Sequence, residues 1–276
     1  MLAVWGTSFI FVKVGLAYSP PFIFAALRQI VGAAAMLPFL LNKREAIPKS
    51  RRELFPLLLL GIFNITLTNG ASFTALQTVP AGLATVIAYT QPVWVFVFAV
   101  VILKESSNAR KVLGTLLGFL GISIIFLPGI QVSQAYLGGQ TLLVFSSFAW
   151  AIGAILFKAK VKTESLYMVN FIMLLFGAAP LLAVSLLTEN LGSIQWTPTF
   201  AVSLFQLGIL AQSVGWTLWL FLIRRLGASK TSSSLFLTPI VTLVVGVVFL
   251  NESLSALEVI GASAALTGTY LVSRSL

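Results

Sequence analysis

Two cationic residues stand inside stretches of sequence that are otherwise apolar, and they are the residues best suited to bind an anion. Lys13 and Arg28 each lie among hydrophobic and small residues, away from the charged loops. A charge near the bilayer centre costs at least about 2.5–3.5 kcal/mol, so an idle one is disfavoured. Both are expected towards the outer ends of their helices. They predict an anion or carboxylate site; snorkelling to the outer interface or hydrogen bonds to carbonyls of packed helices are the alternatives.

Two prolines predict interruptions in the helices that would carry such a site. Pro92 and Pro239 each fall near the middle of an apolar segment. Proline removes the hydrogen bond to the carbonyl four residues earlier, here that of Ala88 and that of Leu235. Matched interruptions in two halves of a chain point to a binding site at the membrane midplane, with the prolines as hinges. A purely structural kink is the alternative. The neighbouring polar residues predicted to face a cavity are Tyr89, Thr90, Gln91 and Thr238.

A further group of polar residues recurs within one apolar segment. Asn64, Thr68 and Ser72 are spaced four apart, so in an α-helix they share one face, and Asn69 is adjacent. Such a face predicts either a polar path or hydrogen bonds that hold neighbouring helices together. Asn64 and Ser72 are therefore candidate substrate contacts.

Aromatic residues predict the apolar part of a pocket. Gln212, Trp216 and Trp219 have the spacing of one helix face. Trp219 lies five residues before Arg224, so we expect it in the aromatic belt at the membrane interface. Trp150 and Trp216 are deeper and could line an amphipathic pocket or pack against lipid.

The residues that are absent restrict the chemistry. The chain has no His, Cys or Asp, so it lacks the usual metal ligands, thiol nucleophiles and the commonest general base. We therefore expect no metal, no cofactor and no enzyme activity. All seven acidic residues fall in predicted loops or at membrane rims, which leaves no mid-membrane carboxylate for proton coupling. They are Glu45, Glu53, Glu105, Glu164, Glu189, Glu252 and Glu258. Of these, Glu105 and Glu252 are expected to be structural, each close to a helix N-terminus.

The elements that position these residues are membrane helices. Only 9% of the residues are charged and 58% are hydrophobic, whereas a soluble domain carries about 25% charged residues. A span needs about 20 mostly apolar residues. Lipid offers no hydrogen-bond partners, so the backbone N–H and C=O groups of a span must bond to each other, as they do in a helix. Ten spans are predicted, at 2–18, 22–41, 54–76, 81–103, 112–130, 137–157, 166–187, 199–223, 228–250 and 256–273.

Basic residues predict the orientation of these spans. Of the 17 Lys and Arg residues, all but Lys13 and Arg28 fall in alternate connections or follow the last span. By the positive-inside rule both termini are cytoplasmic. The expected location is the cell (inner) membrane, which the chain crosses several times. This topology, and not nucleic-acid binding, accounts for the net charge of +10. The basic segments are 42–53, 104–111, 158–162 and 224–230, with Arg274 after the last span.

The chain also repeats itself. An offset of 145 aligns the early part of the two halves, and an offset of 147 aligns the later part. Each half, 1–130 and 131–276, contains five predicted helices, and an odd number makes the second copy enter the membrane from the opposite side. The predicted fold is therefore all-α, with two inverted five-helix repeats around a central cavity. The residues matched at 147 are Ala81 with Ala228, Pro92 with Pro239, Glu105 with Glu252, Gly114 with Gly261 and Gly121 with Gly268.

Four motifs resemble the EamA-type branch of the drug/metabolite transporter superfamily, and within it aromatic and neutral amino-acid exporters. They are Trp5-Gly6-Thr7-Ser8-Phe9 followed by Lys13, Ala25-Ala26-Leu27-Arg28, Pro92…Leu103-Lys104-Glu105 and Pro239…Leu250-Asn251-Glu252. The resemblance covers essentially the whole chain. It implies a cavity lined by helices 1–4 and 6–9, with helices 5 and 10 at the periphery.

The resulting hypothesis is a transporter that exports neutral or aromatic amino acids by alternating access. The superfamily's small cation pumps use a membrane-embedded Glu that is missing here. An exchanger of phosphorylated or nucleotide-linked sugars is the alternative, and a membrane enzyme is a further one. The expected partners are a small-molecule substrate and the lipid bilayer, with no nucleic acid, and nothing in the sequence demands more than a monomer. The candidate substrate contacts are Lys13, Arg28, Asn64, Ser72, Tyr89, Gln91, Trp150, Gln212, Trp216 and Thr238, and the candidate hinges are Pro92 and Pro239.

Overall fold

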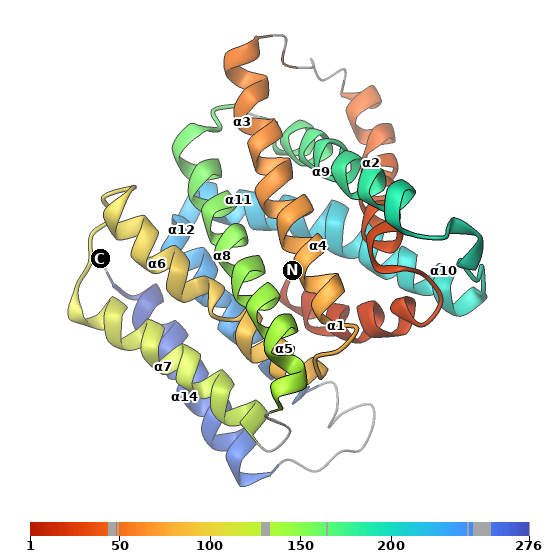
Figure 1. The fold of residues 1–276 in the computed structure, drawn as a ribbon. Coiled ribbons are helices and arrows are strands. Elements are labelled where there is room, and N and C mark those ends of the chain that lie inside the picture. Colours follow the sequence, from red (N-terminus) through yellow and green to blue (C-terminus); the bar gives the residue numbers. More distant parts are fainter. Residues whose placement is uncertain are drawn as a thin grey trace.

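A computed structural model describes residues 1–43, 48, 50–127, 133–163, 165–241, 243–244 and 255–275. Within these residues all regular structure is helical, and the helices form one bundle (Figure 1). Glu45, Glu164 and Glu252 lie outside the described residues. So do residues 242 and 245–250 of the predicted ninth span.

The first half of the chain contributes seven α-helical pieces. They are α1 (Leu2–Leu16), α2 (Pro21–Asn42), α3 (Arg51–Gly61), α4 (Thr68–Ala75), α5 (Ala81–Ala88), α6 (Gln91–Val101) and α7 (Ala109–Phe126). A π-helical segment, Ile62–Leu67, joins α3 to α4 without a break. Helices α5 and α6 are the two parts of one span, separated at Tyr89 and Thr90.

The second half has a similar order of pieces. They are α8 (Leu137–Lys160), α9 (Leu166–Thr188), α10 (Pro198–Leu204), α11 (Trp216–Leu226), α12 (Ala228–Ser233) and α14 (Ala256–Ser273). A π-helical segment, Phe205–Gly215, joins α10 to α11, and a 3-10 segment, Ser234–Leu237, follows α12. Short 3-10 turns at Gln134–Tyr136 and Leu191–Ser193 precede α8 and α10.

Local sequence explains where several helices begin. Helices α3, α7, α9, α10 and α14 each start after a Ser, Thr or Asn whose side-chain oxygen accepts an amide hydrogen bond from the first turn. This contact satisfies one of the free N–H groups at a helix N-terminus. The capping residues are Ser50, Asn108, Ser165, Thr197 and Ser255.

Eight helical stretches are long and apolar enough to cross a membrane. They correspond to eight of the ten predicted spans. The first predicted span is the shorter helix Leu2–Leu16, and the ninth is described only in part, so the count of ten stays a prediction.

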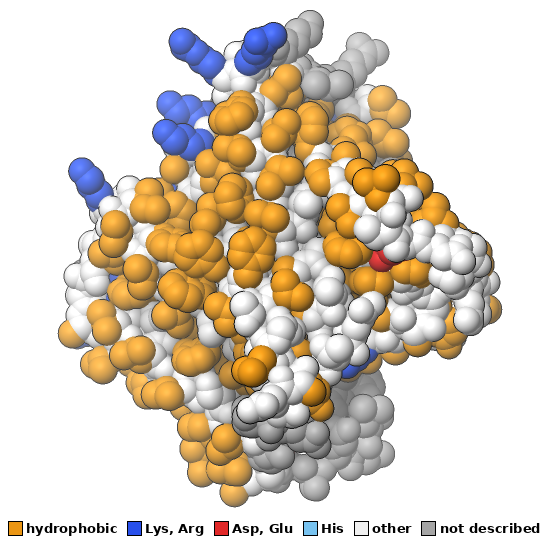
Figure 2. All heavy atoms as spheres, in the orientation of Figure 1, with side chains coloured by type: hydrophobic (Ala, Val, Ile, Leu, Met, Phe, Trp, Pro, Cys, Tyr) orange, Lys and Arg blue, Asp and Glu red, His pale blue; other side chains and the backbone are white. Residues whose placement is uncertain are grey.

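The outer surface is that of a membrane protein. Large apolar side chains are exposed on it, such as Leu187, which is 86% exposed, and Leu41, which is 74% exposed. A surface so extensively apolar is matched to lipid rather than water. Figure 2 shows this apolar face, with most of the visible Lys and Arg side chains gathered at its upper end.

Helices α7 and α14 pack against each other at the edge of the bundle (Figure 1). A Cβ at Gly114 would lie 2.6 Å from the carbonyl oxygen of Gly268, and one at Gly261 would lie 2.5 Å from that of Gly121. Only glycine permits backbones to approach this closely. Shifting the sequence by 147 residues maps Gly114 onto Gly261 and Gly121 onto Gly268. The contact of Gly114 with Gly268 in one repeat therefore corresponds to the contact of Gly261 with Gly121 in the other.

A second pair of close contacts behaves in the same way. A Cβ at Gly32 in α2 would lie 2.8 Å from the carbonyl oxygen of Gly208, and one at Gly61 in α3 would lie 2.9 Å from the amide nitrogen of Gly177 in α9. The offsets of 145 and 147 map Gly32 onto Gly177 and Gly61 onto Gly208. Reciprocal packing of this kind is what two repeats related by a twofold axis would produce, and the inverted repeat itself remains a prediction.

Candidate functional site

A cavity of about 140 Å³ lies between helices of both halves. Its wall includes six of the predicted substrate contacts: Arg28, Ser72, Tyr89, Trp150, Gln212 and Trp216. In the predicted topology its polar end, near Arg28 and Ser72, faces the outside, and its aromatic end faces the cytoplasm. The same wall includes Ala88 and Leu235, whose carbonyls the two prolines were predicted to release.

Arg28 is a buried cation with a partly satisfied side chain. Its side chain is 7% exposed, its Nη2 donates a hydrogen bond to Oδ1 of Asn69, and its Cζ lies 4.6 Å from the centre of the Phe73 ring. The Asn69 Nδ2 donates to the carbonyl of Ile65 at 2.8 Å, which makes the amide oxygen the atom that faces Arg28. The Arg28 Nε is buried without a hydrogen-bond partner among the described residues. A buried donor without a hydrogen bond destabilises the protein, so this edge of the guanidinium is suited to an anionic ligand.

The helix that carries Arg28 is anchored at its N-terminal end. The Glu189 carboxylate accepts hydrogen bonds from the backbone amides of Phe22 at 2.7 Å and Ile23 at 2.8 Å. A carboxylate at this position complements the partial positive charge of the helix N-terminus. Glu189 thus holds the start of α2 about one and a half turns from Arg28.

Trp5, Trp150 and Trp216 line the opposite end of the cavity, and Trp219 packs against Trp5 and Trp150. The Trp5 ring centroid lies 5.8 Å from those of Trp150 and Trp216 and 5.6 Å from that of Trp219. The Trp5 Nε1 donates to the carbonyl of Ala211 at 3.2 Å, which ties α1 to the π-helical segment. The prediction that Trp219 lies at the lipid interface is wrong, because the rings of Trp5 and Trp150 cover it and leave it fully buried.

Both predicted hinges follow a break in α-helical structure. Pro92 is the second residue of α6, directly after the break at Tyr89 and Thr90, and Pro239 follows the 3-10 segment Ser234–Leu237. Tyr89 lines the cavity and its side chain lies beside that of Thr238, so the two interrupted spans meet at the cavity wall.

Four predicted contacts lie off the cavity wall. Lys13 is half-buried on α1, and Gln91 is fully buried at the start of α6. Thr238 is buried and lies beside Tyr89, which lines the cavity. Asn64 is fully buried, with its Nδ2 3.7 Å from the Met173 Sδ.

Of the three residues predicted to share one helix face, Thr68 and Ser72 line the cavity and Asn64 does not. The prediction assumed one continuous α-helix, but Ile62–Leu67 has the wider turn of a π-helix, which rotates what precedes it relative to α4. The face presented to the cavity is therefore built from α4, with Thr68, Asn69 and Ser72.

Sequence reasoning did not select several other lining residues. Trp5 and Ser8 belong to the opening motif, which was a signal for their importance but not for their position. Ser146 forms a hydrogen bond from its Oγ to the carbonyl of Thr68 at 2.8 Å, and no spacing pattern indicated it. The residues missed as contacts are Trp5, Ser8, Asn69 and Ser146.

The fold and the cavity define a polytopic helical membrane protein with a cavity between its two halves. The model of the EamA-like transporter family matches residues 1–127 and again residues 137–274. The chain therefore belongs to the EamA-like transporter family, and it is a membrane transporter.

Several relatives are similar over nearly the whole chain. The uncharacterized transporter YvbV of Bacillus subtilis is 33% identical over 275 residues, covering 99% of this chain and 88% of that one. A probable amino-acid metabolite efflux pump of Salmonella typhimurium is 27% identical over 284 residues, covering 98% of this chain and 91% of that one. A solved crystal structure shares the fold, with a TM-score of 0.83, 18% sequence identity and coverage of 98% of this chain and 94% of that one.

Proposed function

We propose that this transporter exports small metabolites with a free carboxylate, most favourably neutral or aromatic amino acids, by alternating access. The observation that carries the proposal is Arg28, a buried cation on the cavity wall with an unpartnered Nε and no acidic residue among the described residues that line the cavity. The fork of donors on a guanidinium matches a carboxylate, so the substrate supplies the charge that the protein lacks.

The other end of the cavity suits an apolar or aromatic side chain. The rings of Trp5, Trp150 and Trp216 contact one another there, and aromatic pairs favour edge-to-face and tilted geometries that an aromatic substrate can extend. A cavity of about 150 Å³ holds benzene in another protein, so the volume found here is compatible with one ring.

Gln212 offers a partner for the ammonium group of an amino acid. Its side chain lies on the cavity wall, and its Oε1 has no hydrogen-bond partner among the described residues. An amide oxygen accepts hydrogen bonds from an ammonium group without adding charge. In this arrangement Arg28 takes the carboxylate and Gln212 the ammonium.

Export is supported by relatives that are named probable amino-acid metabolite efflux pumps. The inverted arrangement of 1–130 and 131–276 is supported by the two matches to the family model and by the reciprocal glycine contacts. We place both termini in the cytoplasm and the chain in the cell (inner) membrane, with Pro92 and Pro239 as the hinge positions.

The test is transport by the purified protein in liposomes. Labelled phenylalanine, leucine, their amides, phenylethylamine and a sugar phosphate are each loaded inside, and efflux is compared with protein-free liposomes. Amino acids should leave fastest and be recovered chemically unchanged. Faster efflux of the sugar phosphate than of any amino acid would replace the proposal with a phosphorylated-sugar exchanger, and chemical conversion would indicate an enzyme.

A further inference from the structure

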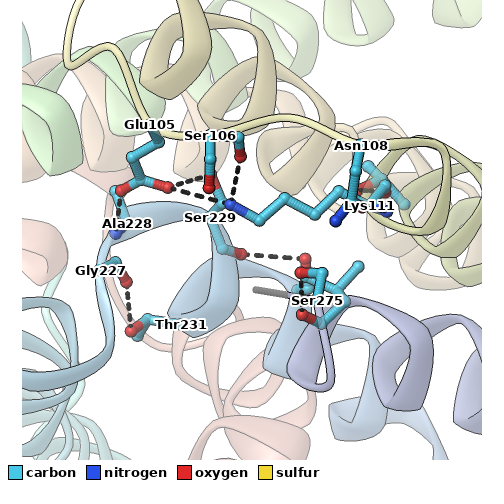
Figure 3. Close-up of polar contacts among 12 residues, drawn as sticks. Glu105, Ser106, Asn108, Lys111, Gly227, Ala228, Ser229, Thr231 and Ser275 are labelled. Carbon is cyan, nitrogen blue, oxygen red and sulfur yellow. Dashed lines mark hydrogen bonds and ion pairs between the residues drawn. The ribbon is translucent and has the colours of Figure 1, made fainter.

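Glu105 joins the two halves of the molecule at the end that is predicted to be cytoplasmic. It lies in the connection between α6 and α7, and its Oε1 accepts a hydrogen bond from the backbone amide of Ala228 at 3.0 Å. Its Oε2 accepts one from the Ser229 Oγ at 2.6 Å. The Lys111 Nζ lies 4.0 Å from Oε2 and donates to the Ser106 carbonyl at 2.6 Å. Figure 3 shows the carboxylate pointing to the start of α12, with Lys111 approaching it from α7.

The backbone on both sides is shaped for this contact. Gly227, just before α12, has φ of 91°, and a Cβ there would lie 3.1 Å from the Glu105 Oε1. Lys104 has φ of 55°, in the left-handed region that few residues other than glycine adopt. The Glu105 amide donates to the Ala99 carbonyl at 3.0 Å, which fixes the turn that presents the carboxylate.

Glu105 places a negative charge where two basic connections meet. The two connections that meet here are both basic, so their close approach is opposed by like-charge repulsion. Among the described residues of the two connections, Glu105 is the acidic one. It lies near Lys111 of its own connection and binds Ala228 and Ser229 of the other. The basic residues of the two connections are Lys104, Arg110 and Lys111 on one side and Arg224, Arg225 and Lys230 on the other.

The element that Glu105 holds leads directly to the cavity. Helix α12 continues through the 3-10 segment to Leu235, which lines the cavity, and to Thr238, which lies beside the cavity residue Tyr89. A movement of α12 as a unit away from Glu105 would therefore displace Leu235 in the cavity wall.

We propose that the contact of Glu105 with Ala228 and Ser229 is a latch that holds the cytoplasmic ends of the two halves together while the cavity faces outward. Its release accompanies opening of the cavity to the cytoplasm. The inference rests on alternating access in the proposed function but not on the identity of the substrate.

Cysteine accessibility without substrate tests the latch separately from transport. The chain has no native cysteine, so Ala88→Cys places a single thiol on the cavity wall. An impermeant thiol reagent is applied to right-side-out and inside-out membrane vesicles. In the chain with Glu105 intact, the thiol should react faster from outside. Adding Glu105→Gln should raise the ratio of cytoplasmic to external labelling roughly tenfold, the scale expected for losing a hydrogen bond to a charged group.

Two further variants define the outcome. Glu258→Gln is the matched control, because Glu258 caps its own helix α14 through Ser255 and makes no contact between the halves in the described structure. It should leave the ratio unchanged. Ser229→Ala removes one of the two hydrogen bonds and should give an intermediate shift. The latch is refuted if Ser229→Ala and Glu105→Gln both keep the parent ratio, or if Glu258→Gln shifts it equally. A shift in the expected order supports the latch even if amino acids prove not to be the substrate.

Discussion

Arg28 donates a hydrogen bond to the side-chain oxygen of Asn69, and the Asn69 amide nitrogen is held by the backbone carbonyl of Ile65. The second bond fixes the direction of the first, because an amide that donates to a carbonyl must turn its oxygen the other way. A charge in α2 is thereby positioned from α4, and its remaining Nε stays without a partner among the described residues. This geometry gives Arg28 a set orientation before any substrate arrives.

Arg28→Gln should therefore weaken export of amino acids more than export of their amides or amines. Loss of a hydrogen bond to a charged group costs about 1.5–3 kcal/mol, on the order of ten- to a hundredfold in affinity. Arg28→Lys should restore part of the loss, because an ammonium keeps the charge but not the two-donor geometry. Initial efflux rates from liposomes measure both effects. An equal decrease for all substrates, together with instability in detergent, would make Arg28 a structural strut.

Pro92→Ala and Pro239→Ala should slow transport while leaving the protein folded. Alanine supplies the amide hydrogen that proline lacks, so each variant can restore a backbone hydrogen bond across the break and stiffen its span. Transport rates and size-exclusion profiles are measured together. Unchanged rates in both variants would show that the prolines are only structural.

Transport should run down the gradient of the substrate without obligatory proton exchange. Proton coupling requires a group that titrates along the membrane path, and the described cavity wall has no carboxylate or histidine. Liposomes with an imposed pH gradient and equal substrate on both sides should show no net movement. Accumulation of substrate under these conditions would contradict the prediction.

A single thiol at Ser50 should be protected from impermeant reagents outside intact cells. Ser50 caps α3 in a basic connection that the positive-inside rule places in the cytoplasm. Ser193→Cys, in the exposed turn between α9 and α10, should be labelled under the same conditions. Labelling of the Ser50→Cys protein and protection of the Ser193→Cys protein would reverse the orientation.

Gly268→Leu should destabilise the protein far more than Gly138→Leu. Gly268 lies against the backbone of α7, whereas a Cβ at Gly138 meets nothing within 4 Å. Forcing a side chain into a packed contact costs about 1–3 kcal/mol. The melting temperature in detergent should fall only for Gly268→Leu, and equal melting temperatures would show that α7 and α14 are not closely packed.

The sequence by itself determined the class of the protein and much of the chemistry of its site. Length and hydropathy of a span depend on residues that are adjacent in the chain, so eight spans were predictable without tertiary contacts. The isolated charge of Arg28 and the interruptions at Pro92 and Pro239 were visible for the same reason. The matches at offsets of 145 and 147 also pointed to glycines that the structure packs in reciprocal pairs.

Only the tertiary structure decided which polar and aromatic side chains meet. Asn69 and not Asn64 lines the cavity, the span that carries both contains a π-helical turn at Ile62–Leu67, and rings from two other helices bury Trp219. Glu105 looked like a cap for a nearby helix, yet it binds α12, which begins 123 residues later. Helix phase and carboxylate partners depend on contacts between segments distant in the chain, and a periodicity that assumes regular α-helix contains no information about those contacts.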